Sequence, residues 1–451
     1  MHKAATGANV MTQFQSWIDA VNANNGVIQI ALTVFQILIT FFGFLLITRK
    51  QIHRDRYEER LNQLKKTVDT LTVSRNDFAE RALALYREHF RSDPDCSEFV
   101  EHGHLIYRNG WVNCKDSQGR FYPLSSFTPK IASRYTPPAP KKNHTLPDQQ
   151  ESYADNVKFY LGKTLMDLPL YGLNEVRLHP DEIEITVNLG SYFDFYNTCE
   201  YRGYEMAYAR RILGKTAVSA KTLPARYGKN NEGLNLFNTG NRFPGIGINT
   251  MTILKNVLDD QEPDRDPPMR DFFLMHKRSK QVAEGIGNYH VIPAGSYQPL
   301  KDYLDHSDET RAETMKDTVL REFGEEIKDY EEFIDLNTSQ LLQNLDQLLD
   351  PYFLGVGFEP LNTKTEVLSA LILDLEQPKI RALFQGQRHY SQLQTLLDRN
   401  NNYEGEIHLC PLTCSTLRQY ENDFRSTASM KEIMRILQLE ENRAFFHVQN
   451  I

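Results

Sequence analysis

The sequence predicts an α+β protein with an N-terminal transmembrane helix, a helical stalk and a mixed α/β body. Three observations predict it: an uncharged apolar run at residues 26–48, a heptad-like apolar spacing after it, and alternating strand and helix patterns from about residue 98 onward. At 451 residues the chain is long enough for two or three domains. Its net charge of −8 argues against binding to duplex nucleic acid, and its five cysteines suit a reducing compartment.

The run at residues 26–48 is long enough to cross a bilayer, because about 20 apolar residues span the hydrocarbon core. A buried soluble helix or a signal peptide would be the alternative, but a signal peptide has a shorter apolar part and a small-residue cleavage site. Arg49, Lys50 and Arg54 follow the run, whereas only Lys3 is basic before it. By the positive-inside rule, we expect a single span with residues 1–25 outside and the rest of the chain in the cytoplasm.

Residues 49–92 are predicted to form the stalk, as one long helix from about Gln51 to His89. Its apolar seam is formed by Leu61, Leu64, Val68, Leu71, Phe78 and Leu85. This spacing fits a parallel coiled coil that would join copies into a homo-oligomer, and it equally fits an amphipathic helix packed on the chain's own body. Arg75 falls on the seam, and both alternatives stay open.

Residues 93–239 form a middle region whose role the sequence does not define. Short strands are predicted between 98 and 127, a proline-containing loop at 135–150, strands at 174–195 and a helix at 201–213. No motif with a chemical mechanism occurs in this region.

The most informative stretch is residues 313–327, which we expect to form a helix. Glu322, Glu325 and Glu326 share one arc of that helix, beside an apolar stripe that would pack on a sheet. Carboxylates at these spacings repel one another, and a hard divalent cation with oxygen ligands would turn the repulsion into attraction. The pattern indicates metal-assisted displacement at phosphorus, and the alternative is a solvated acidic face.

A longer pattern around these residues resembles the signature of the Nudix hydrolases. Glu313 is followed after seven residues by Arg321, Glu322, Phe323, Gly324, Glu325 and Glu326. Ser307 and Lys328 stand where that signature has glycines, and Asp329 replaces its last hydrophobic residue. Strands predicted at 245–254, 271–278 and 288–299 precede the helix, and strands at 353–358 and 367–373 follow it. The resemblance covers about 240–400 and implies a Nudix-like α/β/α sandwich. After it, amphipathic segments predict a helical C-terminal cap at 401–451.

The resemblance also implies a site. Mg²⁺ or Mn²⁺ would be held by Glu322, Glu325 and Glu326, with catalytic roles for Glu313, Arg321 and Glu325. Glu313 also fits a capping box with Thr310, and we favour this interpretation, because nine residues before Glu322 it faces away from the triplet and would support the loop instead of the metal. Arg321 would orient Glu322 or bind a substrate phosphate. A further carboxylate would come from the later strands, and the candidates are Glu359, Glu366, Asp374 and Glu376.

The order of span, stalk, middle region and Nudix-like domain resembles a narrower group, the membrane-anchored SMODS-associated Nudix effectors of bacterial CBASS antiphage systems. This resemblance implies location in the bacterial inner membrane, a cyclic oligonucleotide or other nucleotide as ligand, and hydrolysis of nucleoside diphosphate-linked substrates that leads to abortive infection. Two alternatives stay open. One is a non-catalytic nucleotide sensor whose transmembrane helices cluster and disrupt the membrane, and the other is a membrane-tethered housekeeping Nudix hydrolase.

Overall fold

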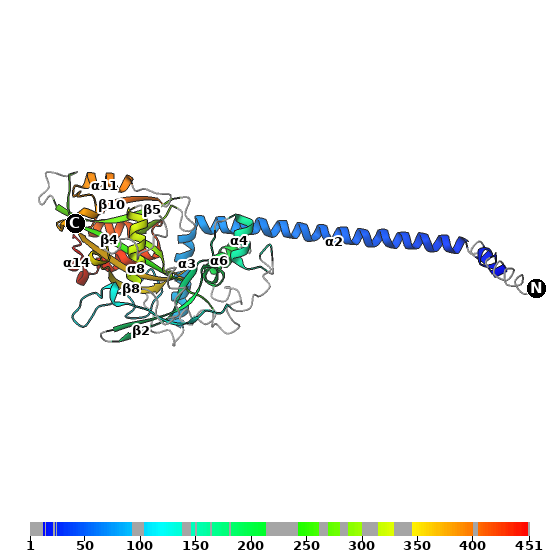
Figure 1. Ribbon diagram of the computed structural model, residues 1–451, viewed down its shortest axis with the longest axis horizontal. Coiled ribbons are helices and arrows are strands. Elements are labelled where there is room, and N and C mark those ends of the chain that lie inside the picture. The colour runs from blue at the N-terminus through cyan, green and yellow to red at the C-terminus, as the bar shows by residue number, and fades with distance from the viewer. Residues whose placement is uncertain are drawn as a thin grey trace, which may run out of the picture. The chain divides into compact units, whose positions relative to one another are not determined.

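The computed structural model is a mixed α+β protein that divides into two compact units, residues 1–62 and residues 63–451 (Figure 1). The structure describes residues 12–13, 15–20, 23, 25–92, 103–137, 146–148, 151–162, 165–179, 182–212, 242–260, 269–279, 287–299, 314–328, 345–399 and 405–449. Helix α2 (Asn25–Val73) begins in the first unit, and its residues from Gln63 onward belong to the second.

The N-terminal helix has the length and the apolar surface that a membrane span needs. Within the described residues, one helix passes this test of length and composition, and its described part runs from Thr33 to Val73. Large apolar side chains such as Phe35, Phe42 and Phe44 are each at least 60% exposed in the chain alone. Lipid would cover these side chains, since exposed apolar surface is unfavourable in water.

The stalk is two helices in the structure, so the prediction of one continuous helix is wrong at Ser74. Helix α2 ends at Val73, and α3 (Arg75–Ser92) begins after a one-residue turn. Among the seam residues, Leu64 and Val68 are buried in one hydrophobic cluster of the second unit, and Leu71 and Phe78 in another. From Leu64 onward the seam therefore packs on the chain's own body, as the amphipathic-helix alternative predicts. Association of copies through the stalk stays a prediction.

The centre of the second unit is a seven-stranded mixed sheet. Its strands are β4 (Ile246–Leu258), β5 (Met269–Arg278), β6 (Tyr289–Val291), β7 (Ala294–Ser296), β8 (Tyr352–Phe358), β9 (Thr365–Asp374) and β10 (Gly405–Pro411). The order is β10-β5-β4-β9-β8, with β6 paired to β5 and β7 paired to β4. Only β4 and β9 run parallel among these pairs. The strands predicted before and after the acidic helix are confirmed, whereas β10 lies in the segment predicted as a helical cap.

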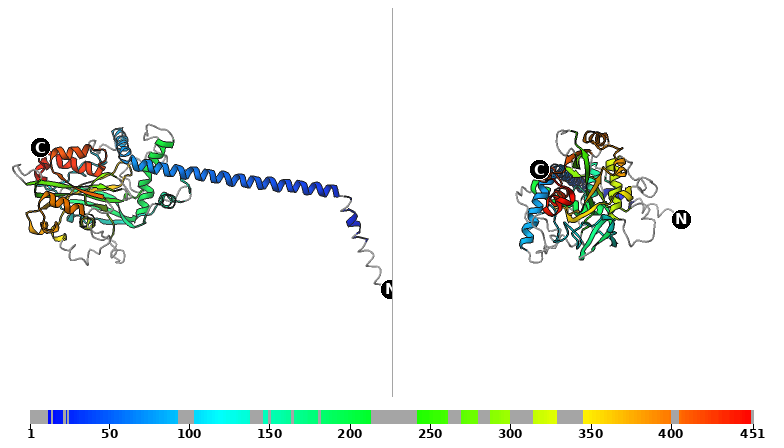
Figure 2. Two further views of the ribbon diagram at one scale, coloured as in Figure 1. Left: turned by 90° about the horizontal axis from the view of Figure 1, so that it is seen from above. Right: turned by 90° about the vertical axis from the view of Figure 1, so that its left-hand side faces the viewer.

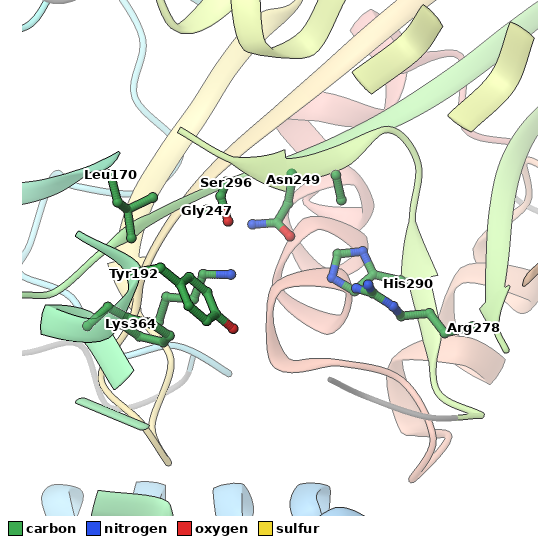
Figure 3. A pocket seen from close by; sticks show the side chains of 11 residues that line it. Leu170, Tyr192, Gly247, Asn249, Arg278, His290, Ser296 and Lys364 are labelled. Atoms are coloured by element: carbon green, nitrogen blue, oxygen red, sulfur yellow. The ribbon is translucent and has the colours of Figure 1, made fainter. Parts of the chain in front are cut away.

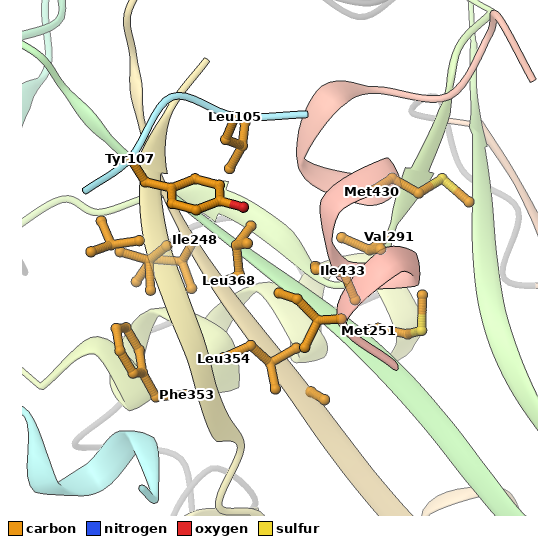
Figure 4. Packing of buried hydrophobic residues seen from close by; sticks show 14 of the residues in the cluster. Leu105, Tyr107, Ile248, Met251, Val291, Phe353, Leu354, Leu368, Met430 and Ile433 are labelled. Atoms are coloured by element: carbon orange, nitrogen blue, oxygen red, sulfur yellow. The ribbon is translucent and has the colours of Figure 1, made fainter. Parts of the chain in front are cut away.

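Helices cover both faces of this sheet. One face packs against α8 (Met315–Glu322), α10 (Pro378–Leu383) and α11 (Tyr390–Arg399), and the other against α12 (Cys414–Asn422), α13 (Ala428–Gln438) and α14 (Glu440–Phe446). Alternation along β5 explains the two cores: Phe272 and Leu274 belong to the α8 side, and Phe273 and Met275 to the α13 side. Figure 4 shows Met430 and Ile433 of α13 against Met251 and Val291, and Figure 2 shows the C-terminal helices, in red, on one side of the sheet. Each such side chain contributes about 1.5–3 kcal/mol on full burial.

The middle region packs into the same core. Its elements are η2 (Leu124–Ser126), β1 (Lys130–Arg134), α4 (Tyr153–Leu161), β2 (Pro169–His179), β3 (Glu182–Ser191), α5 (Tyr192–Phe195), the π-helical turn η3 (Tyr196–Glu200) and α6 (Tyr201–Ile212). A second sheet has the order β1-β3-β2. The strands predicted between 98 and 127 are isolated bridges instead, for example the bond from Ile106 N–H to the carbonyl of Phe358 at 2.9 Å. Here the edge of β8 supplies most of the partner groups, so the described residues 103–127 form no separate sheet.

Candidate functional site

The acidic helix begins later than the sequence predicts. Thr314 is the N-cap of α8, and it forms a capping box with Asp317: the backbone N–H of each residue donates to the side chain of the other, at 3.0 and 3.3 Å. The capping box predicted at Thr310 and Glu313 lies outside the described residues.

The apolar stripe of this helix is confirmed. Val319, Leu320, Phe323 and Ile327 are all buried, at 2% exposure or less. The helix widens at its end into a π-helical turn, η6 (Phe323–Ile327), and such turns occur frequently at functional sites. Glu322 is the last residue of α8, and Glu325 and Glu326 lie in η6. The packed stripe therefore fixes these carboxylates at the edge of the sheet.

Arg321 lies among the three glutamates. One Nη of Arg321 is 2.6 Å from Glu322 Oε1, and the other is 3.4 Å from Glu325 Oε2. Arg321 also donates to the carbonyl of Ser296 at 3.2 Å. Burial alone lowers the pKa of Arg321, but Glu322 and Glu325 raise it, and the net direction is upward. Arg321 thus stays charged and orients two of the carboxylates, one of the two roles that the sequence left open.

The third carboxylate is held by the backbone of β7. Glu326 is 6% exposed, and its Oε2 accepts a hydrogen bond from Ala294 N–H at 2.9 Å. Glu322 reaches the next residue, because a Cβ built on Gly295 would overlap the Glu322 carboxylate. Glu322 and Glu326 therefore converge on the dipeptide Ala294–Gly295. Ser307 and Lys328 replace the glycines of the Nudix signature, and the glycine that makes room for a carboxylate here is Gly295.

The structure distinguishes the four later carboxylates. Glu359 accepts from the backbone N–H groups of Leu361 and Asn362, and burial raises its pKa to about 7. Asp374 accepts from Asn256 at 2.7 Å, and Glu376 pairs with Arg388 at 3.0 Å. These three side chains stabilise turns or surface contacts.

Glu366 is the fourth candidate, and it lies beside a cavity. It is 6% exposed, accepts from Asn249 Nδ2 at 2.5 Å and lies 3.8 Å from Lys364 Nζ. A Cβ on Gly247, its register partner on β4, would lie 2.7 Å from Glu366 Oε2. Glycine at this position therefore leaves room for the carboxylate.

The cavity has a volume of about 170 Å³ and lies where the sheet divides. The first residues of β4 pair with β7, and the last residues of β5 pair with β6, so the two short strands separate β4 from β5. The polar side chains around it are Tyr192, Asn249, Arg278, His290, Ser296 and Lys364 (Figure 3). Side chains alternate along a strand, so Ala294 and Ser296 point away from the carboxylate that meets Gly295. Strand β7 thus lies between the acidic cluster and the cavity.

Sequence reasoning found the acidic cluster but not the cavity. Lys364 is an isolated basic residue in the sequence, Arg278 lies in a short basic run with Lys277 and Lys280, and neither pattern marks a cavity. Gly245 and Gly247 form a Gly-x-Gly pair, but it lies at the start of β4 and not before a helix, so it is a weak signal for a phosphate site. Cys410 and Cys414 are buried free thiols.

The three glutamates provide the oxygen donors that Mg²⁺ prefers, although no group of three or more His, Cys, Asp or Glu within the described part of the chain is arranged as a metal site. Arg321 pairs with Glu322 and Glu325, so the cluster contains a cation among its carboxylates. The metal that the sequence predicts stays a prediction. No protein-family description matches this chain, and neither does any curated protein.

Proposed function

We propose that this chain is a membrane-anchored Nudix-type effector of a bacterial cyclic-oligonucleotide (CBASS) antiviral system, and that its body is a Mg²⁺-dependent hydrolase of nucleoside diphosphate-linked substrates. The convergence of Glu322 and Glu326 on Ala294–Gly295 is the observation that carries this proposal. A mixed sheet with helices on both faces supports a Nudix-like α/β/α sandwich, because the acidic helix follows the strands in the order that the resemblance requires.

In this proposal the metal would be held by Glu322, Glu325 and Glu326, where it would polarise a diphosphate and activate water. Arg321 keeps Glu322 and Glu325 close together, although their charges repel each other. Ala294 N–H fixes the orientation of Glu326. The apolar stripe of α8 prevents the cluster from moving away from the sheet, which matters because a misplacement of about 1 Å can cost a hundredfold in rate.

The anchor supports location in the inner membrane. The apolar part of α2 is followed by Arg49, Lys50 and Arg54, and this charge distribution favours an external N-terminus and a cytoplasmic body. The nucleotide substrates proposed here are present in the cytoplasm. The span would thus keep a hydrolase at the membrane without removing it from its substrates.

The test uses the full chain in detergent and a panel of nucleoside diphosphate-linked compounds. We expect Mg²⁺-dependent release of nucleoside monophosphate or phosphate, which EDTA abolishes. Glu322→Gln with Glu326→Gln should lower the rate at least a hundredfold, since both changes remove a charged oxygen ligand. Glu376→Gln is the matched control, because this exposed carboxylate pairs only with Arg388 in the described contacts, and its rate should stay unchanged. Absence of Mg²⁺-dependent release across the panel would exclude the hydrolase.

One observation favours a second function, a nucleotide sensor that does not cleave its ligand. Arg321 already neutralises part of the cluster, through its contacts of 2.6 and 3.4 Å with Glu322 and Glu325. For a sensor, Glu325→Gln with Glu326→Gln leaves toxicity in bacteria unchanged, while removal of residues 1–48 abolishes it. For a hydrolase, the double variant abolishes toxicity, and the truncated chain still turns over substrate.

A further inference from the structure

We propose that the cavity between β4, β5, β6 and β7 is a binding site for the phosphate-bearing part of a nucleotide, separate from the acidic cluster. This inference deepens the proposed function, and only the class of ligand that it names rests on that function. The cavity has its own charge, its own hydrogen-bonding groups and its own size, each of which points to that ligand (Figure 3).

The charge of the cavity is positive. Arg278 and Lys364 both line it, whereas Glu366 is the carboxylate nearest to Lys364. No carboxylate of the described residues forms an ion pair with Arg278, and its buried Nε has no hydrogen-bond partner there. Glu366 Oε1 forms a long ion pair with Lys364 at 3.8 Å, while its Oε2 accepts a hydrogen bond from Asn249, so this one carboxylate only partly offsets the two basic side chains. A buried donor without a partner is costly, so an anion that accepts from Arg278 stabilises this arrangement.

His290 adds a hydrogen-bond acceptor to the cavity. Burial, followed by the positive charge of Arg278, lowers the pKa of His290 to about 3, so the ring is neutral near pH 7. Its Nδ1 is 2.8 Å from the carbonyl of Val291, which accepts only if Nδ1 carries the proton. Nε2 is therefore the acceptor nitrogen. A ligand with a hydroxyl or amine donor next to its phosphate matches this pair of groups, as the sugar and base of a nucleotide do.

The size of the cavity limits how much of the ligand it holds. A volume of about 170 Å³ is below the roughly 300–1,000 Å³ of a site that encloses a drug-sized molecule. It suits one phosphate and an adjoining sugar, with the base outside. Tyr192 lines the cavity, and its ring packs against the rings of Phe195 and Tyr196, with centroids 5.8 Å apart in each pair.

The test measures binding by calorimetry, with the full chain in detergent and in EDTA, so that the acidic cluster holds no metal. The probes are AMP, adenosine and inorganic phosphate. We expect AMP to bind at least about tenfold more tightly than adenosine, because adenosine lacks the anion. Arg278→Gln and Lys364→Met should each weaken AMP binding at least about tenfold, which corresponds to about 1.4 kcal/mol.

Lys277→Met is the matched control, because Lys277 is the neighbour of Arg278 on β5 and pairs with Glu406 at 3.0 Å, away from the cavity. The control should bind AMP like the unchanged chain, and thermal melting should show that all variants are folded. Any one of three results would overturn this inference: AMP does not bind, adenosine binds as tightly as AMP, or both cavity variants bind AMP as tightly as the unchanged chain.

The outcomes separate the two proposals. If AMP binding depends on Arg278 and Lys364 but the chain shows no Mg²⁺-dependent hydrolysis, the cavity proposal is supported and only the hydrolase proposal is refuted. If the cavity variants hydrolyse substrate and bind AMP like the unchanged chain, only the cavity proposal is refuted.

Discussion

Gly295→Ala tests whether the acidic cluster is built as described. The new Cβ overlaps the Glu322 carboxylate, so Glu322 has to move and its 2.6 Å ion pair with Arg321 is lost or distorted. Overpacking costs about 1–3 kcal/mol, and a lost charge-assisted hydrogen bond costs about 1.5–3 kcal/mol. The two costs describe one displacement and do not add. Alanine also has less conformational freedom than glycine in the unfolded chain. This difference stabilises the folded state by about 0.4–1 kcal/mol, since the φ of Gly295 is not positive and alanine can adopt it. We expect a net loss of about 2 kcal/mol in the free energy of unfolding.

The assay is a double-mutant cycle with Glu322→Ala, read by urea unfolding of the chain in detergent. In the Glu322→Ala background the overlap is absent, so Gly295→Ala should be neutral or stabilising by about 0.5 kcal/mol. The coupling between the two sites should then be about 2–3 kcal/mol. Gly203→Ala serves as the control, since its Cβ would have its nearest contact at 3.3 Å, with Leu361. A Gly295→Ala penalty that is the same in both backgrounds, within about 0.5 kcal/mol, would refute the proposed packing of Glu322 on β7.

Two further predictions concern buried charges near the start of α3. Arg75 donates to both oxygens of Glu200, at 2.7 and 3.0 Å, so Arg75→Met leaves a buried carboxylate and should cost about 3 kcal/mol in the unfolding free energy. Lys277→Met breaks an exposed pair and should cost less than about 1 kcal/mol, and equal costs in the two variants would contradict this reading. Burial raises the pKa of Glu359 from 4.5 to about 7, so the folded state prefers the protonated form, and its stability falls as the pH rises from about 5 through 7. Glu359→Gln imitates the protonated form, and its melting temperature should exceed that of the unchanged chain at pH 8 but not at pH 5; a difference that does not depend on pH would argue against the shift.

Much of the fold follows from local patterns in the sequence. Short apolar runs predicted β4, β5, β8 and β9, and the stripe that contains Phe323 predicted which side of α8 is buried. Other elements depend on partners that are distant in sequence. Residues 103–127 bridge to β8, and β10 is a strand because β5 offers it an open edge, with seven residue pairs in register. Local preference alone could not decide these cases.

For the candidate site, the sequence by itself determined the three glutamates, their arginine, the apolar stripe beneath them and the uncharged run near the N-terminus, because spacing along one helix fixes which of its side chains are neighbours. Only the tertiary structure decided that Glu322 and Glu326 meet Ala294 and Gly295, and that Arg278 and Lys364 line one cavity. Sheet order and strand register bring these residues together across long stretches of chain, and no short pattern encodes either of them.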